Sequence, residues 1–323
     1  MSTKQGRSGY IRLLPMIPLR LLCLVLFLFA FSALPGIFEL IDSSPYHDLY
    51  SNKEARAADH TLSHALAGKI GDLQMSFGVY PEAKVAIYIV YGADEYKLLS
   101  SGKAAIVEFS DAFYSGNERA IYARSKDQVL DNHLKILVHE YIHWYIEELF
   151  TAAPLWFHEG MATYFSQQLG YDRYLIYLKE SLINPHSDLF RMGYRYPEHR
   201  EDWPRFYLSS AMAVRYMQDR YPLQWQRFWE SVARDKRSGK RSTFSTCFVN
   251  SYQMSLWDFH RKFAIHSKRQ GYLYLFVALN SLIFAILPFA MFAIARKRRR
   301  RLLELPDLPL QDEESEPEDP DRT

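Results

Sequence analysis

Cysteine is almost absent from this chain of 323 residues, which contains only Cys23 and Cys247. The long segment from residue 40 to residue 271 holds just Cys247, so no disulfide can form within it. Internal repeats are also lacking. The segment has about 230 residues, enough for one domain with its own hydrophobic core. The sequence therefore excludes a small disulfide-stabilised scaffold and predicts a domain that depends on its core.

Acidic residues are missing from the start of the chain, where none precedes Glu39. Four basic residues lie there instead, and an almost wholly apolar run follows at residues 21–34. This order is typical of a signal peptide or of a signal anchor. The wider apolar span from residue 13 to residue 38 is also long enough to stay in a membrane. The sequence leaves both alternatives open for residues 1–38.

Charge is absent again from residues 272–295, and a basic cluster follows at residues 296–301. About 24 apolar residues can cross about 30 Å of hydrocarbon as a helix, and positive flanks stay in the cytoplasm. We therefore expect a transmembrane helix at 272–295 and an extracytoplasmic domain at 40–271. Residues 296–323 would then be a cytoplasmic basic cluster followed by an acidic, disordered tail. The membrane position accounts for the basic cluster, so no nucleic-acid partner is expected.

One short motif carries most of the chemical information: His139-Glu140-Tyr141-Ile142-His143. Apolar residues at helical spacing predict a largely buried helix over residues 135–150. On a helix, His139 and His143 project from one face and can bind one metal ion, while Glu140 lies close enough to act on a metal-bound water as general base. This pattern indicates a zinc hydrolase site. The alternative is a pair of core histidines or a site that binds metal without turnover.

A catalytic zinc ion normally takes three protein ligands, so a third must come from elsewhere in the chain. Pro154 favours a helix start and Gly170 a helix end, which predicts a second helix over residues 155–169. Glu159 lies near its first turn and is the candidate third ligand. Gly160 would permit close approach of another helix. His158 should face away from the ion and serve packing or the substrate side of the site.

The motif together with Trp156-Phe157-His158-Glu159-Gly160 resembles the gluzincin metallopeptidases of the thermolysin-like MA clan. The likeness is closest to bacterial membrane-anchored proteins with a peptidase MA-like domain and covers about residues 84–233. It implies an α+β, zincin-like two-lobed fold, a Zn²⁺ cofactor bound by His139, His143 and Glu159, and a peptide or protein substrate. The same group has a helix after the site that resembles residues 206–217 here, in which Tyr207 would stabilise the oxyanion. An ordinary core tyrosine is the alternative for Tyr207.

Two features depart from the better-known members. Where thermolysin-like relatives have an aspartate one turn after the glutamate ligand, this chain has Thr163, so support for a zinc-binding histidine is in question. The Gly-x-Met-Glu-Asn segment that binds a free amine in the aminopeptidase branch is absent. The resemblance therefore favours an endopeptidase.

Other elements are expected at residues 50–77 (helix), 85–91 (buried strand) and 119–124 (strand), with mainly helical structure from 155 to 266. An irregular stretch around residues 185–205 is expected at the rim of the cleft. By family analogy, residues 120–123 would be the edge strand that holds an extended substrate. His60 and His64, four residues apart on the first helix, are expected at the surface rather than in a second metal site.

The leading hypothesis is therefore a zinc metallopeptidase anchored in the bacterial plasma membrane, with its catalytic domain outside. A membrane-bound scaffold or sensor that keeps the zincin fold without hydrolysis is the alternative, and its case depends on Thr163 and the acidic tail. An intramembrane protease would need the motif inside a hydrophobic span, and Lys135, Glu147 and Glu148 flank it instead. The sequence thus predicts an enzyme working in water beside a lipid bilayer.

Overall fold

The structure is a computed structural model that describes residues 38–303, apart from residues 55, 102–109, 126–129 and 184–188. The described residues form two compact units. The first holds those up to Gly170 together with Leu189–Phe259, and the second holds those of Tyr171–Asp188 and those from His260 onward. The apolar run of residues 21–34 and the tail from residue 304 lie outside the described residues. The predictions for both segments, and the four-part division of the chain, stay predictions.

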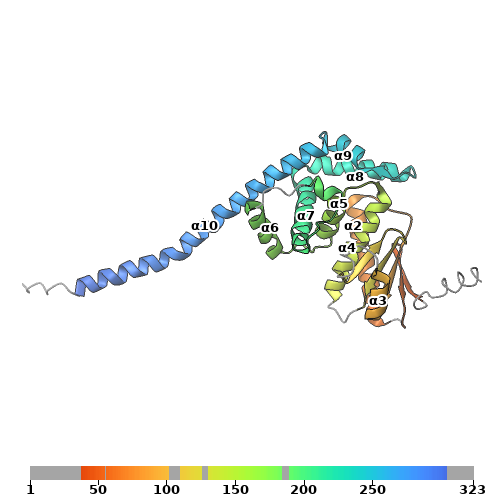
Figure 1. Cartoon of the computed structure of the whole chain (residues 1–323), viewed down its shortest axis with the longest axis horizontal. Coiled ribbons are helices and arrows are strands. Elements are labelled where there is room, and N and C mark those ends of the chain that lie inside the picture. Colours follow the sequence, from red (N-terminus) through yellow and green to blue (C-terminus); the bar gives the residue numbers. More distant parts are fainter. Residues whose placement is uncertain (1–37, 55, 102–109, 126–129, 184–188, 304–323) are drawn as a thin grey trace, which may run out of the picture. The chain divides into compact units, whose positions relative to one another are not determined.

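The first unit contains a five-stranded mixed sheet in the order β1-β2-β3-β5-β4 (Figure 1). Leu49, Ile87 and Ile121 lie in register on one face and are fully buried, while half-buried tyrosines on the other face stack across the same strands. The central pairs are parallel and the two outer pairs antiparallel. The strands are β1 (Glu39–Ser43), β2 (His47–Ser51), β3 (Val85–Val90), β4 (Ala112–Ser115) and β5 (Ala120–Arg124).

Helices α2 (Ala57–Phe77) and α4 (Leu130–Leu149) pack against each other, and α4 also lies against β4 and β5. The short helix α3 (Ala93–Ser100) contacts β5. The helix predicted from residue 50 begins only at Ala57, because residues 47–51 pair with β1 and β3 as strand β2. Asp59 then accepts a hydrogen bond from the backbone N–H of Arg56 at 3.0 Å, which favours a helix start at this point.

The edge-strand prediction is wrong. Residues 120–123 belong to β5, which pairs on both sides with β3 and β4, so its backbone groups are used within the sheet. The edge position belongs to β4, which the sequence pattern did not identify. Four residues with little alternation give too weak a pattern to mark a strand.

The helical part of the first unit encloses a core of aromatic side chains. Phe150, Phe157, Phe228 and Phe244 are fully buried, with neighbouring ring centroids 4.7–6.0 Å apart. Strands β6 (Phe150–Thr151) and β7 (Ser242–Thr243) pair beside it. The elements are α5 (Leu155–Phe165), the 3-10 helices η2 (Arg191–Gly193) and η3 (Arg200–Asp202), α7 (Trp203–Arg220), α8 (Pro222–Arg237) and α9 (Phe244–Tyr252).

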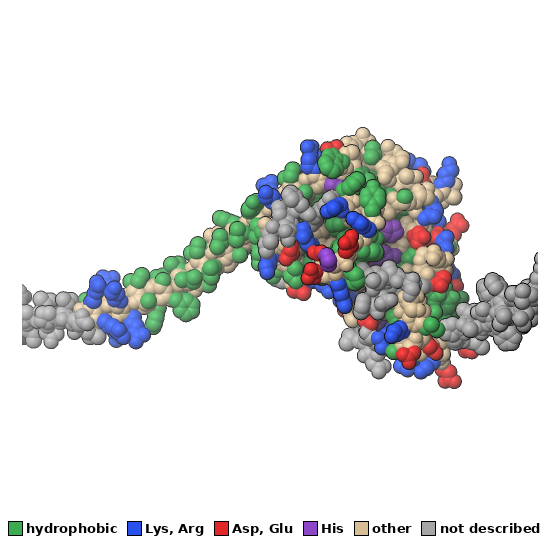
Figure 2. Space-filling model, in the orientation of Figure 1, with side chains coloured by type: hydrophobic (Ala, Val, Ile, Leu, Met, Phe, Trp, Pro, Cys, Tyr) green, Lys and Arg blue, Asp and Glu red, His purple; other side chains and the backbone are tan. Residues whose placement is uncertain are grey.

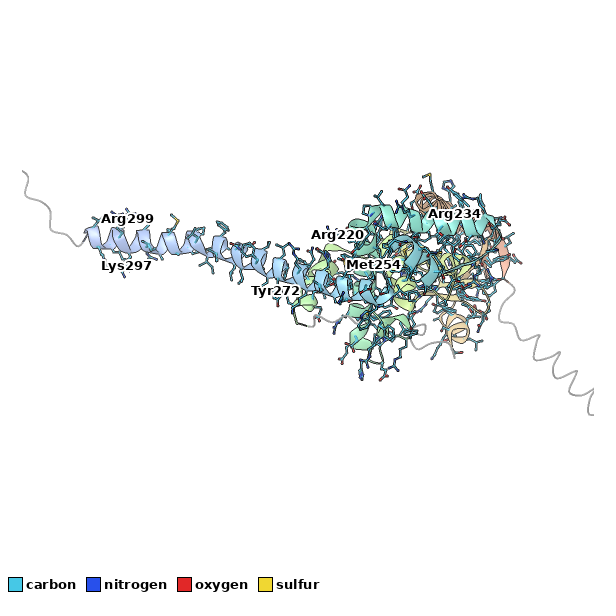
Figure 3. The ribbon with its side chains drawn as sticks, turned by 90° about the horizontal axis from the view of Figure 1, so that it is seen from above. Arg220, Arg234, Met254, Tyr272, Lys297 and Arg299 are labelled. Carbon is cyan, nitrogen blue, oxygen red and sulfur yellow. The ribbon has the colours of Figure 1, made fainter. Side chains whose placement is uncertain are left out.

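The second unit consists of α6 (Tyr171–Ile183) and most of α10 (Leu256–Leu303). A hydrogen bond of 2.5 Å joins the Tyr177 and Ser267 hydroxyls of these two helices. Within the described residues, α10 is the helix long and apolar enough to cross a membrane by length and composition. The apolar side chains of α10 between Tyr272 and Ile294 are exposed (Figure 2). Lys297 and Arg299 project near the end of the helix (Figure 3).

Candidate metal centre

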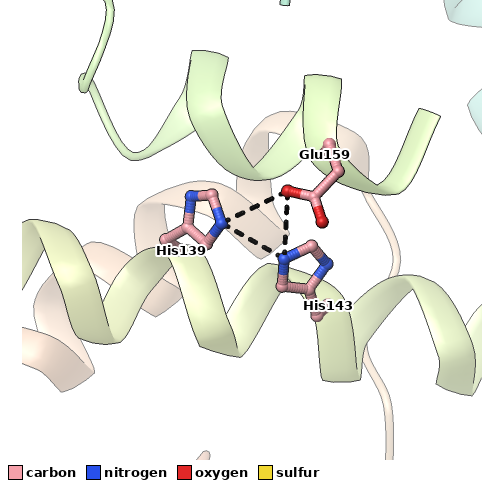
Figure 4. Close-up of side chains that lie close together, drawn as sticks. All are labelled: His139, His143 and Glu159. Carbon is pink, nitrogen blue, oxygen red and sulfur yellow. Dashed lines mark hydrogen bonds and ion pairs between the residues drawn. The ribbon is translucent and has the colours of Figure 1, made fainter. Parts of the chain in front are cut away.

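The two motif histidines lie one turn apart on α4 and point to the same place (Figure 4). Their ring centroids are 4.9 Å apart, and their Nε2 atoms are separated by 3.2 Å. The helix extends from Leu130 to Leu149, so it begins earlier than the predicted residue 135 and ends one residue sooner. Most of its apolar side chains are buried, which fixes the face that carries the imidazoles.

Glu159 comes from α5, which packs against both α4 and α7. Its Oε2 atom lies 3.6 Å from His139 Nε2 and 3.6 Å from His143 Nε2. A donor atom from each of the three residues lies within 4.8 Å of the others, and they form the one such metal-capable group among the described residues. The predicted helix 155–169 ends at Phe165, since the chain turns through a left-handed conformation at Gln167. Glu159 is nevertheless on the helix, as expected.

Gly160 allows α5 to approach α7 closely. A Cβ atom at this position would lie 2.3 Å from the carbonyl oxygen of Ser210 and 2.7 Å from Val214 Cγ2. Any larger residue would push the two helices apart, and Glu159 is the neighbouring residue. The predicted role of Gly160 in close helix approach agrees with this geometry.

Glu140 is almost buried beside His139, and its Oε2 atom accepts a hydrogen bond of 2.8 Å from the backbone N–H of Tyr114 on β4. Burial raises the pKa of this carboxyl, His139 opposes the rise, and Glu159 adds to it, giving a pKa of about 7. A group with a pKa near neutrality can both take up and release a proton under physiological conditions.

Tyr196 is a site residue that the sequence pattern did not reveal. Its hydroxyl donates a hydrogen bond to Glu159 Oε1. Burial alone would raise the pKa of Glu159, but His143 and His139, with this hydrogen bond, lower it to about 2. The carboxylate is therefore ionised and oriented. Tyr196 lies in the irregular stretch between η2 and η3, where no periodicity could reveal it.

A cleft of about 430 Å³ opens over this centre. Tyr207 of α7 lines it, with its ring centroid 6.5 Å from that of His139. His158 also lines the cleft, and its ring stacks on that of His143 with the centroids 6.1 Å apart, which agrees with a residue of the substrate side that is not a metal ligand. Gly193 and Tyr196 form part of the rim, as predicted for the irregular stretch. Residues of β4 and Glu147 complete much of the remaining wall.

The departure at Thr163 has a structural counterpart. Thr163 is buried, and neither its Oγ1 atom nor Nδ1 of His139 has a hydrogen-bond partner among the described residues.

His60 and His64 are exposed, and neither belongs to a metal-capable cluster in the described part of the chain. This agrees with the expectation of a surface position for both.

No known family model matches the chain, and no curated protein matches it. Among solved structures, the chain is similar to the crystal structure of an aminopeptidase N family protein from Idiomarina loihiensis, with 17% identity and a TM-score of 0.42. The match covers 70% of this chain and 46% of that one, so the chain spans less than half of that structure. The described residues themselves show a mixed α+β fold, an apolar helix, and a group of two histidines and a glutamate.

Proposed function

We propose that this chain is a membrane-anchored zinc peptidase that cleaves peptide bonds within the chain of its substrate, on the outer side of the plasma membrane. The observation that carries the proposal is the convergence of His139, His143 and Glu159 beside Glu140 at the floor of a cleft. The apolar part of α10 supports the anchor. The basic residues at its end support a cytoplasmic C-terminus.

The geometry of the donor atoms fits a zinc ion. Ligand atoms about 2.1 Å from a tetrahedral zinc ion lie about 3.4 Å apart. The three separations here are 3.2, 3.6 and 3.6 Å. Glu159 Oε2 is also a buried acceptor with no hydrogen-bond partner among the described residues, which is costly unless a cation is bound. Two imidazoles and one carboxylate are a common ligand set for catalytic zinc.

When bound, zinc supplies a Lewis acid that polarises a carbonyl oxygen and makes water acidic enough to ionise near neutral pH. The surrounding residues would transfer the proton, stabilise the oxyanion and bind the substrate. Glu140, held by the Tyr114 N–H, takes a proton from water and passes it to the leaving amine nitrogen. Tyr207 donates a hydrogen bond to the developing oxyanion. The outer edge of β4 lines the cleft, and an extended peptide can lie along it, although the Tyr114 N–H is already bonded to Glu140.

Metal content and turnover of three purified proteins test this proposal. The full chain should bind about one zinc ion, whereas Glu159→Ala should bind markedly less, because one of three ligands is gone. Glu140→Gln should keep the zinc and lose at least about 100-fold in turnover of a peptide mixture.

Full activity of Glu140→Gln would contradict the mechanism. A well-folded chain without zinc would contradict the metal site. Stoichiometric zinc without turnover of any peptide would favour a membrane scaffold or sensor, an alternative that the unpartnered His139 Nδ1 and Thr163 Oγ1 also favour.

A further inference from the structure

The side chains that line the cleft carry an unequal charge. Three glutamates, Glu140, Glu147 and Glu159, contribute to its wall, and no lysine or arginine among the described residues does. In the proposed function, the charges of Glu140 and Glu159 balance the two positive charges of a zinc ion. Glu147 takes no part in that balance. The working cleft therefore keeps one negative charge that nothing in its described wall neutralises.

Glu147 lies one turn beyond His143 on α4, about 6 Å further along the helix axis. Its carboxylate is next to Gly116, just after β4, where a Cβ atom would lie 3.3 Å from Glu147 Oε2. The Tyr114 phenol also lies close to this carboxylate. Burial is the main cause that raises the pKa of the phenol, and the hydrogen bond and negative charge of Glu147 raise it further. The carboxylate is thus fixed at the end of the edge strand, beside the path of an extended peptide.

Glu147 and the next residue, Glu148, have different surroundings. Glu148 is buried and forms ion pairs with Arg119 and Lys236, the latter at 3.7 Å. Glu147 is only half-buried and has no ion pair among the described residues. Arg241 bonds to the backbone carbonyl of Glu147, and the charges of Arg241 and Arg119 reach the nearby Tyr114 phenol, but neither guanidinium forms an ion pair with the Glu147 carboxylate among the described residues.

We propose that Glu147 selects substrates that place a cationic group, a protonated amine or a guanidinium, beside it in the cleft. The inference rests on the proposed function, because the charge balance assumes a bound zinc ion. An extended peptide rises about 3.3 Å per residue, so 6 Å corresponds to about two residues from the cleaved bond. A lysine or arginine side chain can supply the charge there, and so can a free α-amino group close to the cleaved bond.

Peptide libraries with free and with acetylated N-termini separate these two sources. The zinc-loaded full chain in detergent is incubated with each library, and cleavage sites are mapped by mass spectrometry. Lysine and arginine should be enriched at least about ten-fold at one position within two residues of the cleaved bond. Glu147→Gln should abolish the enrichment, and Glu147→Lys should replace it by enrichment of acidic residues. Glu230→Gln, on the exposed face of α8, is the matched control and should keep it.

Binding without cleavage provides a second readout. Two peptide hydroxamates are compared that differ at one residue, which is lysine in one and norleucine in the other. Each is titrated into the Glu140→Gln variant and into the double variant that also carries Glu147→Gln. The lysine compound should bind at least about ten-fold more tightly, and only while Glu147 is present.

The outcomes separate the two proposals. Cleavage without preference for a cationic group overturns the role of Glu147 and leaves the peptidase standing. Preference confined to free N-termini assigns the charge to the α-amino group, which supports Glu147 and overturns cleavage within the chain of the substrate. Lysine-selective binding without any cleavage supports Glu147 and overturns the peptidase. If no peptide is cleaved and neither hydroxamate binds selectively, both are overturned.

Discussion

At the scale of single residues, the candidate centre depends on a side chain outside the motifs. Tyr196 donates to Glu159 Oε1, while Thr163 and His139 Nδ1 make no hydrogen bond within the described residues. Partners that orient a ligand commonly contribute to metal affinity. In this protein the glutamate is oriented by a tyrosine, whereas Thr163, one turn further along α5, makes no hydrogen bond to either histidine within the described residues.

Removal of the Tyr196 hydroxyl should therefore weaken metal binding. We expect Tyr196→Phe to lower zinc affinity by about 10-fold to 100-fold, because Glu159 loses the donor that fixes its second oxygen. Competition with a chromophoric chelator measures the change. Tyr194→Phe is the matched control, since Tyr194 is 77% exposed on the same segment. Equal affinities in all three proteins would exclude this role for Tyr196.

His47 gives a second residue-scale prediction, away from the metal centre. It is fully buried on β2, with ring nitrogens 2.9 Å from Ser44 Oγ and 3.0 Å from Ser63 Oγ. Burial lowers its pKa to about 4, against 6.5 in an unfolded chain, although Asp42 and Asp48 oppose the shift. The stability that neutral His47 contributes is thus complete above pH 6.5 and is lost as the pH falls towards 4.

Between pH 7 and pH 4, the wild-type protein should lose about 3 kcal/mol more unfolding free energy than His47→Gln. Urea unfolding at several pH values measures this difference. His64→Gln alters an exposed histidine and should follow the wild type. Parallel pH profiles for wild type and His47→Gln would show that His47 does not titrate on unfolding.

At the scale of elements, the contact between α5 and α7 positions Glu159. We expect Gly160→Ala to destabilise the protein by about 1–3 kcal/mol, because the new methyl group meets the Ser210 backbone. Gly68→Ala is the control: it lies on the exposed face of α2 with nothing within 4 Å of the new Cβ. There, alanine should stabilise the helix by about 0.5–1 kcal/mol. Denaturant midpoints of both variants measure the contrast, and a stabilising effect at Gly160 would contradict the packing argument.

The same two helices show what could be predicted from the sequence. Residue spacing on α4 places His139 and His143 on one face, so this pair could be predicted from the sequence alone. Glu159 lies on a separate helix, and residue spacing does not show that it meets the two histidines. Glu147, four residues after His143, lies on the same side of α4, and its proposed role depends on its place in the wall of the cleft. Strand β4 and Tyr196 could not be found this way, because their positions depend on contacts between distant segments rather than on local periodicity.

At the scale of the whole molecule, the proposed function requires the first unit to lie outside the cytoplasm while the end of α10 lies inside. The apolar side chains of α10 between Tyr272 and Ile294 are exposed, as expected for contact with lipid rather than with protein. The basic residues 296–301 at the end of the helix should remain on the cytoplasmic side.

Reporter fusions test this topology in a bacterial host. Green fluorescent protein fused after Thr323 should fluoresce, and alkaline phosphatase fused at the same place should be inactive, because the phosphatase requires export to form its disulfides. Fusions after Gly271, before the apolar stretch, should give the opposite pattern. Replacement of the six basic residues 296–301 by glutamine should weaken the orientation signal and produce a mixed population. An active phosphatase after Thr323 in the unaltered chain would place the end of α10 outside, and the candidate metal centre would then belong to the cytoplasm.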